Sequence, residues 1–275
     1  MYERHWQLNG RPFENWCDHR FYFASAPHEA ALLKIRYAIE HRRSAIALCG
    51  DSGMGKTMLI DLLVDQLPEF CAPVARIVFP RLPADQLLGY LADELTGQEQ
   101  GEGDSPLQSL RRIEHFLREN VAAGRQSLVI VDEAHLLSAE QPLEILRLLL
   151  NLRTEIQDAE SAWTMVLVGD SPLLGLLERN PALDQRLSGK CLLGRLTREQ
   201  TRAYVAHRLQ VVGGRIDSIF TPAAIQSLHV RGGGVPRRIN RLADLALMVG
   251  YGDDLSIIDA PQIESVHQEM ITVAA

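Results

Sequence analysis

The chain has 275 residues, of which 46% are hydrophobic and 23% are charged. These proportions are typical of soluble globular proteins and exclude a mostly disordered chain, and the length suits one large α/β domain with a smaller satellite domain. The net charge of -7 argues against a surface that is basic everywhere, as a non-specific DNA-binding protein would need, but it is compatible with a local basic patch.

The spacing of the cysteines and the length of the apolar runs predict the cellular compartment of the protein. Cys17, Cys49, Cys71 and Cys191 include no Cys-x-x-Cys pair, so the sequence predicts neither a zinc site nor a disulfide framework. No run approaches the ~20 apolar residues that span a bilayer, and the N-terminus lacks the basic-then-apolar pattern of a signal peptide. We therefore expect a cytoplasmic protein that is not inserted in a membrane.

Strand and helix patterns alternate along the first two thirds of the chain. Strands are expected at 44–49, 74–79, 127–132 and 162–169, and helices at 56–67, 84–95, 106–122 and 140–153. Continuous apolar strands that alternate with helices predict a parallel sheet covered on both faces. Beyond Gly194 the pattern is helical only, at 197–212, 221–230, 235–250 and 260–270.

A glycine-rich segment follows the first strand and opens the first helix. It matches G-x-x-x-x-G-K-[ST], in which backbone N–H groups wrap around phosphate and the helix N-terminus adds partial positive charge. Lys56 is expected to reach the β- and γ-phosphates of ATP, and the Thr57 hydroxyl to ligate Mg²⁺. The predicted nucleotide-binding residues of this segment are Gly50, Asp51, Ser52, Gly53, Met54, Gly55, Lys56, Thr57 and Met58.

Two adjacent acids end the apolar run at 127–132. Carboxylates at the carboxyl edge of a parallel sheet lie where α/β proteins bind ligands. Asp132 is expected to hold the Mg²⁺ shell, and Glu133 to act as the general base that activates water. The alternative is that the acids begin a helix as N-cap residues. His135 either couples the acids to a neighbouring subunit or simply packs or lies at the surface.

The phosphate-binding segment, the acidic pair and the C-terminal helices together resemble the AAA+ superfamily of ATPases. An N-terminal box and later segments narrow the resemblance to the ExeA/GspA (general secretion pathway protein A) family, over residues 1–270. The box comprises Tyr2, His5-Trp6, Leu8, Pro12-Phe13, Phe21-Tyr22 and His28-Glu29-Ala30, and the later matches are Val168–Leu174, Leu183–Leu187, Leu196–Glu199, Tyr204–Leu209 and Gly233–Asn240.

The resemblance implies a P-loop NTPase fold with a parallel sheet core, followed by a small all-helical lid domain. We expect an N-terminal strap and helix joined to the core at 1–43, the ATPase core at 44–193 and the lid at 194–275. ATP and Mg²⁺ are the implied cofactors. We expect a short form of the family, without the transmembrane helix and wall-binding domain of longer members.

Three further site residues are carried over by position from the family. Asp170, after the fourth strand, falls at the sensor-1 place that positions the attacking water; an amide is usual there, and Asp170 as a turn residue before Ser171-Pro172 is the alternative. Arg186 occupies the place of the arginine finger, which acts on the γ-phosphate of a neighbouring subunit, with Arg179 as its competitor.

The third carried-over residue lies in the predicted lid. In the segment 233–240 the proline suits the first turn of a helix, so Arg237 would project toward the nucleotide as sensor 2, with Arg238 as the alternate. Aromatic residues between Pro12 and Phe23 either wall the adenine pocket or pack in a core.

Three functions are compatible with these motifs and this resemblance. The first is an ATP-hydrolysing homo-oligomer, a ring or filament, that acts as a motor or switch on an unknown protein client in secretion or pilus assembly. The second is an ATP-dependent DNA-binding regulator of the transposition type, which the net charge does not favour. The third is a degenerate ATPase used as a scaffold, against which the intact Lys56, Thr57, Asp132 and Glu133 argue.

Overall fold

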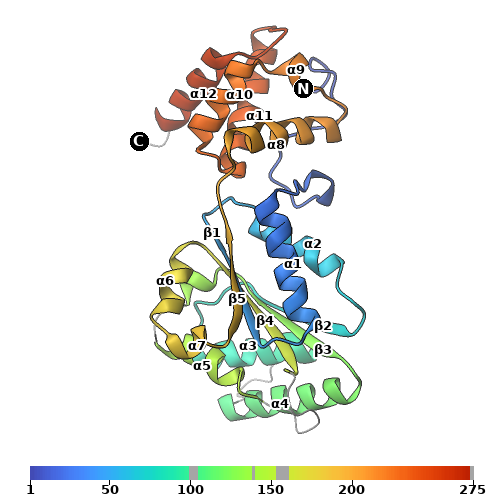
Figure 1. Cartoon of the computed structure of the whole chain (residues 1–275), viewed down its shortest axis with the longest axis vertical. Helices are drawn as coiled ribbons and strands as arrows, with labels where there is room; N and C mark the ends of the chain where they lie inside the picture. Colours follow the sequence, from blue (N-terminus) through green and yellow to red (C-terminus); the bar gives the residue numbers. More distant parts are fainter. Residues whose placement is uncertain (99–104, 138–139, 153–160, 273–275) are drawn as a thin grey trace. The chain divides into compact units, whose positions relative to one another are not determined.

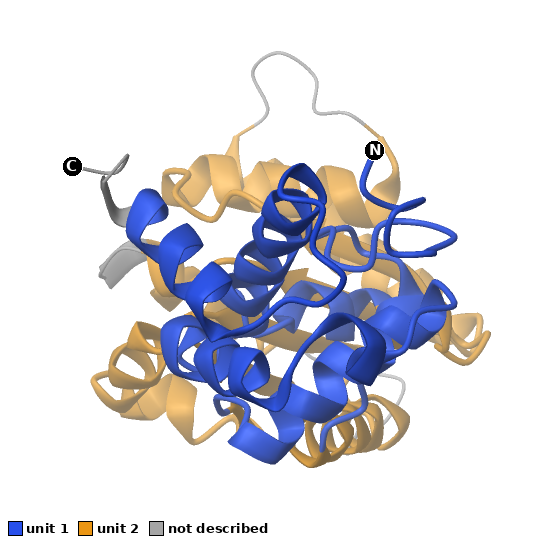
Figure 2. Ribbon diagram, turned by 90° about the horizontal axis from the view of Figure 1, so that it is seen from above, with its two compact units in different colours: residues 1–25, 53–61, 194–275 blue, residues 26–52, 62–193 orange. Residues whose placement is uncertain are grey.

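The computed structural model describes residues 1–98, 105–137, 140–152 and 161–272. Its contacts divide the chain into two compact units (Figure 2). The helical unit comprises Met1–Ser25, Gly53–Asp61 and Gly194–Ala275, and the sheet unit comprises Ala26–Ser52 and Leu62–Leu193. The predicted domain boundaries at 1–43, 44–193 and 194–275 concern divisions along the sequence and stay predictions.

Five parallel strands form the centre of the sheet unit (Figure 1). Their order in the sheet is β2-β3-β4-β1-β5. The strands are β1 (Ala45–Gly50), β2 (Cys71–Ile77), β3 (Gln126–Val131), β4 (Trp163–Gly169) and β5 (Leu187–Leu193). The parallel sheet and the helical C-terminal region that the sequence predicts are therefore confirmed.

Helices cover the sheet on both faces. Their bounds in the sheet unit are α1 (Ala26–Glu40), α3 (Ala84–Thr96), α4 (Pro106–Ala122), α5 (Glu140–Leu149), α6 (Pro172–Glu178), α7 (Pro181–Asp184) and the short η2 (Ala134–Leu136), while α2 (Lys56–Asp65) begins in the helical unit and ends in the sheet unit. Ala47, Val129 and Leu167 share one core with α3, α4 and α5. Because strand side chains alternate between faces, their neighbours Leu48 and Ile130 point to the opposite face.

One strand differs from its predicted position, and another was not predicted. The second strand is β2, Cys71–Ile77, rather than 74–79, because the apolar run continues into Val78 and Phe79, which are exposed after the strand has ended. The sequence pattern misses β5, an edge strand whose burial is mixed: Ser188 and Leu192 are exposed, and the side of the strand away from β1 has no strand partner among the described residues. Such a strand lacks the continuous apolar run that reveals a central parallel strand.

The helical unit buries three of the N-terminal aromatic residues, whereas Trp16 is exposed. Its helices are α8 (Arg198–Val211), α9 (Ile216–Ile219), α10 (Pro222–Gly232), α11 (Pro236–Gly252) and α12 (Ala260–Thr272), with η1 (His19–Phe21) in the N-terminal segment. Tyr2, Trp6 and Phe13 belong to the core that these helices share. The Trp6 indole donates a hydrogen bond to the carbonyl of Leu247, 3.0 Å away. For these three aromatics, core packing is therefore the observed role.

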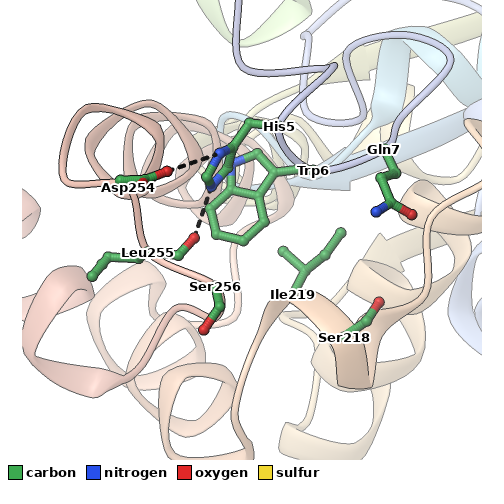
Figure 3. Close-up of a pocket in the computed structure, with 8 residues that line it drawn as sticks. All are labelled: His5, Trp6, Gln7, Ser218, Ile219, Asp254, Leu255 and Ser256. Atoms are coloured by element: carbon green, nitrogen blue, oxygen red, sulfur yellow. Dashed lines mark hydrogen bonds and ion pairs between the residues drawn. The ribbon is translucent and has the colours of Figure 1, made fainter.

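His5 attaches the N-terminal segment to the loop after α11. Its Nε2 donates to the carbonyl oxygen of Leu255, 2.7 Å away, and its Nδ1 lies 3.7 Å from a carboxylate oxygen of Asp254. Figure 3 shows the imidazole between these two residues, beside the Trp6 indole. Residues 1–25 thus form part of the helical unit through both apolar and polar contacts. Within the described residues, no helix combines the length and apolar character that a membrane span requires.

Candidate nucleotide site

The carboxyl ends of three strands meet at one edge of the sheet unit. In the parallel registers, Cys49 of β1 lies opposite Gly169 of β4, and Val131 of β3 lies opposite Leu167 of the same strand. Gly50 ends β1, and Asp132 and Asp170 directly follow β3 and β4. This edge is where open α/β sheets bind ligands, so residues that are far apart in the sequence are brought to one place.

The glycine-rich segment continues from β1 to the first residue of α2, Lys56. Gly53 and Gly55 have φ angles of 83° and 89°, in the left-handed region that favours glycine. Lys56 is only 9% exposed, whereas Thr57 is exposed. A loop of this conformation at a helix N-terminus presents backbone N–H groups to an anion, and the side chain of Lys56 adds a positive charge beside it.

The backbone at Glu133 is unusual. Its φ and ψ are 48° and 34°, a left-handed conformation that non-glycine residues rarely adopt and that often marks functional sites. Glu133 occupies the N-cap position of η2, but its side chain makes no capping hydrogen bond. The Asp132 carboxylate instead accepts the N–H of Glu133, 2.9 Å away. The Glu133 carboxylate therefore projects half-exposed at the edge of the sheet.

The donor chemistry of Asp132 and Thr57 suits Mg²⁺. This ion prefers oxygen ligands and keeps several waters, so a carboxylate and a hydroxyl are appropriate partners. Asp132 is half-buried and uses one carboxylate oxygen for the N–H of Glu133, which leaves further lone pairs for an ion or its water shell. Their roles as metal ligands stay predictions.

The turn after β4 is tied to both the phosphate loop and the acidic pair. The Ser171 hydroxyl donates to Asp51 Oδ1, 2.6 Å away. The N–H of Asp170 donates to Nδ1 of His135, 3.1 Å away, and the same nitrogen lies 3.3 Å from Oε2 of Glu133. His135 therefore has polar contacts with both the turn after β4 and the acidic pair. The sequence does not reveal these contacts, because no local pattern joins Asp51 to Ser171 or His135 to Asp170.

Arg186 lies at the opposite end of the parallel strands, where the amino ends of β1 and β5 lie. Leu187, the next residue, lies opposite Ala45 at the amino end of β1, whereas Leu193 lies opposite Gly50 at its carboxyl end. From residue 187 to residue 193 the strand rises by about 20 Å at ~3.3 Å per residue. Arg186 is thus remote from Asp132 and Asp170 of its own chain. Arg179, its competitor, is exposed and caps the C-terminus of α6.

Arg186 lines a groove of about 990 Å³ between α1 and the amino ends of β1 and β5. Three further cations, Lys34, Arg43 and Lys190, line the same groove, together with the exposed apolar side chains of Leu33 and Tyr37. Lys190 also pairs with Asp184, 2.6 Å away. This face of the sheet unit is positively charged although the chain as a whole is acidic.

Arg237 lies beside the phosphate loop within the helical unit. Its N–H donates to the carbonyl of Gly53, 3.2 Å away. A Cβ placed on Gly53 would lie 2.7 Å from the Cβ of Arg237, so the two backbones approach as closely as glycine allows. Pro236 is the first residue of α11, and both Arg237 and Arg238 are exposed in its first turn. The roles of both arginines stay predictions.

This fold and this arrangement of a phosphate loop and acids define the class of P-loop ATPases called AAA+. The comparison with protein families agrees: the model described as an AAA domain matches residues 39–177. The chain belongs to this AAA family and, within it, to the ATPases of the ExeA/GspA type.

The second assignment rests on a curated relative, General secretion pathway protein A of Aeromonas hydrophila. It is 37% identical over 256 residues, which cover 91% of this chain and 45% of the relative. The chain thus spans less than half the length of that protein. The expected resemblance is confirmed for the ATPase part that the two chains share.

Solved structures support the fold. The ORC2 protein of Aeropyrum pernix, in ADPNP-ADP complexes, has a TM-score of 0.67 and 16% identity, covering 95% of this chain and 72% of that one. A chain of Drosophila ORC bound to DNA has a TM-score of 0.66 and 18% identity, covering 93% and 65%. The RuvB branch migration motor of Thermotoga maritima has a TM-score of 0.56 and 16% identity, covering 89% and 69%. At these identities the likeness concerns the fold alone.

Proposed function

We propose that this protein binds ATP with Mg²⁺ and hydrolyses it to ADP and phosphate. The observation that carries the proposal is the meeting of Gly50, Asp132 and Asp170 at one edge of the sheet, where the phosphate loop leaves β1. The loop and Lys56 bind the phosphates, and Thr57 and Asp132 hold Mg²⁺, which neutralises charge on the β- and γ-phosphates.

In the proposed reaction Glu133 acts as the general base. It takes a proton from a water molecule, whose oxygen forms a bond to the γ-phosphorus while the bond from that phosphorus to the bridging oxygen of ADP breaks. In this proposal Asp170 orients that water, although a carboxylate in this role is unusual. Arg237, which belongs to the predicted lid, contacts the phosphates in this proposal.

The position of Arg186 supports an oligomer. It lies at the far edge of the sheet from its own acidic pair, so a role in hydrolysis requires the site of a neighbouring subunit. We propose a nucleotide-dependent homo-oligomer, a ring or filament, that acts on a protein partner. The 37% identity with General secretion pathway protein A favours a secretion or pilus setting. The DNA-bound relatives in the fold comparison are too distant to favour a DNA partner.

The test of the proposed hydrolysis compares Glu133→Gln with Glu119→Gln. Both are exposed glutamates beside a histidine, since Glu119 lies 3.4 Å from Nε2 of His115 on α4. Glu133→Gln is expected to bind ATP with Mg²⁺ and to lose at least about 100-fold in kcat, whereas Glu119→Gln keeps wild-type turnover. Lys56→Ala is expected to lose ATP binding. Wild-type turnover in Glu133→Gln would exclude the assigned base.

A further inference from the structure

One chain of contacts joins the acidic pair to the phosphate loop within the sheet unit. Glu133 Oε2 lies 3.3 Å from His135 Nδ1, the same nitrogen accepts the N–H of Asp170, and the adjacent Ser171 donates to Asp51. One carboxylate oxygen each of Glu133 and Asp170 and one ring nitrogen of His135 all lie within 4.8 Å of one another. Each distance is short enough for a direct polar contact, and the two at His135 Nδ1 are alternatives.

The fold provides a fitted place for the imidazole. A Cβ on Gly169 would lie 3.0 Å from the backbone nitrogen of His135 and 3.4 Å from its Nδ1, so the ring packs against the end of β4 where only a glycine leaves room. The His135 side chain is 16% exposed, and that of Glu133 is 49% exposed. The imidazole is therefore mostly buried, whereas about half of the Glu133 side chain is open to solvent.

The two partners of His135 compete for one nitrogen. Nδ1 accepts from the N–H of Asp170 when it carries no proton, and it donates to Glu133 when it does. It can serve only one of the two at a time. Asp170 is joined through the adjacent Ser171 to Asp51, so a path of contacts links the phosphate loop to the ring.

We propose that His135 is a positioning residue, which holds the Glu133 carboxylate against the turn after β4 and makes its placement depend on the phosphate loop. This inference rests on the proposed function, because it assigns a partner to the proposed base. In this role His135 acts through Glu133 and contacts neither the phosphates nor the attacking water. Its loss therefore slows hydrolysis and leaves ATP binding intact.

The kinetic test uses substitutions that separate the two ring nitrogens. In His135→Asn the side-chain amide falls near the place of Nδ1, where its nitrogen can donate to Glu133 or its oxygen can accept from Asp170. In His135→Gln the amide reaches the place of Nε2, and His135→Leu has neither. We expect kcat to fall by about 10- to 100-fold in the Leu and Gln variants, with KM for ATP changed less than about 2-fold, and to recover to within about 3-fold of wild type in the Asn variant. His115→Leu, at the exposed His–Glu pair of α4, is the matched control.

The outcomes separate this inference from the proposed function. Normal kcat in His135→Leu, together with an inactive Glu133→Gln, would overturn the role of His135 and leave the general base in place. Equal losses in the Leu and Asn variants would assign the ring a packing role and also overturn it. An inactive wild-type protein would instead contradict the proposed function.

A spectroscopic measurement tests the inference without turnover. In protein with ¹⁵N-labelled histidine, we expect the His135 Nδ1 resonance to show the hydrogen bond from Asp170 and to shift when ADP is replaced by a non-hydrolysable ATP analogue with Mg²⁺. The shift is expected to be lost in Ser171→Ala, which breaks the link to Asp51. Identical Nδ1 resonances in the two nucleotide states would show that the ring does not respond to the phosphate loop.

Discussion

The N–H of Arg237 donates a hydrogen bond to the carbonyl of Gly53, which joins the first turn of α11 to the phosphate loop. Both residues belong to the helical unit. The contact is possible because Gly53 has a left-handed φ and no Cβ. It makes the geometry of the loop and the position of Arg237 depend on each other.

Gly53→Ala is therefore expected to abolish ATP binding. The new Cβ would lie 2.7 Å from the Cβ of Arg237, in addition to a left-handed backbone that costs alanine about 1 to 2 kcal/mol. Gly124→Ala is the matched control, because Gly124 has a φ of 76° but nothing within 4 Å of its added Cβ. Gly124→Ala should lose only the backbone cost in urea titrations and Gly53→Ala should lose more, and only Gly53→Ala should lose nucleotide binding by calorimetry. Equal ATP affinity in the two would contradict the close contact.

Arg237→Ala is expected to weaken ATP binding by about 10- to 100-fold, which corresponds to the ~1.5–3 kcal/mol of a hydrogen bond to a charged group. Arg238→Ala is expected to bind ATP as the wild type does. The two exposed arginines are adjacent in the first turn of α11, so helix stability is affected alike. Titration of each variant with a fluorescent ATP analogue measures the difference, and a larger loss in Arg238→Ala would reverse the assignment.

A mixing experiment tests whether Arg186 acts on a neighbouring subunit. Arg186→Ala alone should lose about 10³-fold in kcat, because an arginine finger stabilises transition-state charge. Glu133→Gln subunits lack the base but still offer Arg186. Mixing the two inactive proteins should therefore restore part of the ATPase activity, since an intact site faces an intact arginine in some pairs. Arg179→Ala should remain active without mixing; restoration by Arg179→Ala instead would make Arg179 the finger.

Arg208 anchors the N-terminal segment to α8. Its guanidinium donates to the carbonyls of Pro12, at 2.5 Å, and Glu14, at 2.6 Å, and it is 4% exposed. Arg208→Leu would leave these carbonyls without their charged donor, so we expect a loss of about 2 to 4 kcal/mol in the free energy of unfolding and faster proteolysis near residue 25. Arg202→Leu, which removes an exposed ion pair of the same helix, should cost less than about 1 kcal/mol.

The cysteines provide a test of the fold. Cys49, Cys71 and Cys191 are buried, and burial raises the pKa of Cys71 to about 11 and also raises that of Cys191. Thiolates are the reactive form, so these thiols should resist modification at pH 8. We expect a thiol reagent to modify Cys17 rapidly in the native protein and all four cysteines after denaturation. Rapid reaction of Cys71 would contradict its place at the start of β2.

The sequence alone was sufficient to recognise the local motifs of the candidate site. A glycine-rich loop between a strand and a helix, and two acids after an apolar strand, are patterns of contiguous residues whose backbone and charge requirements can be recognised without a fold. The same holds for the central strands and the C-terminal helices, because periodicity and capping are local. The edge strand β5 was missed because its burial depends on which strand lies beside it.

The tertiary structure decided how these parts are connected. The order β2-β3-β4-β1-β5 brings Asp170 to the same edge as Asp132 and puts Arg186 at the opposite one. The contact of His135 with Asp170 and that of Arg237 with Gly53 join positions far apart in the chain. Motifs can be recognised in the sequence because they are local, whereas the partners of His135 and Arg237 follow from strand order and close packing, which arise only from the assembled chain.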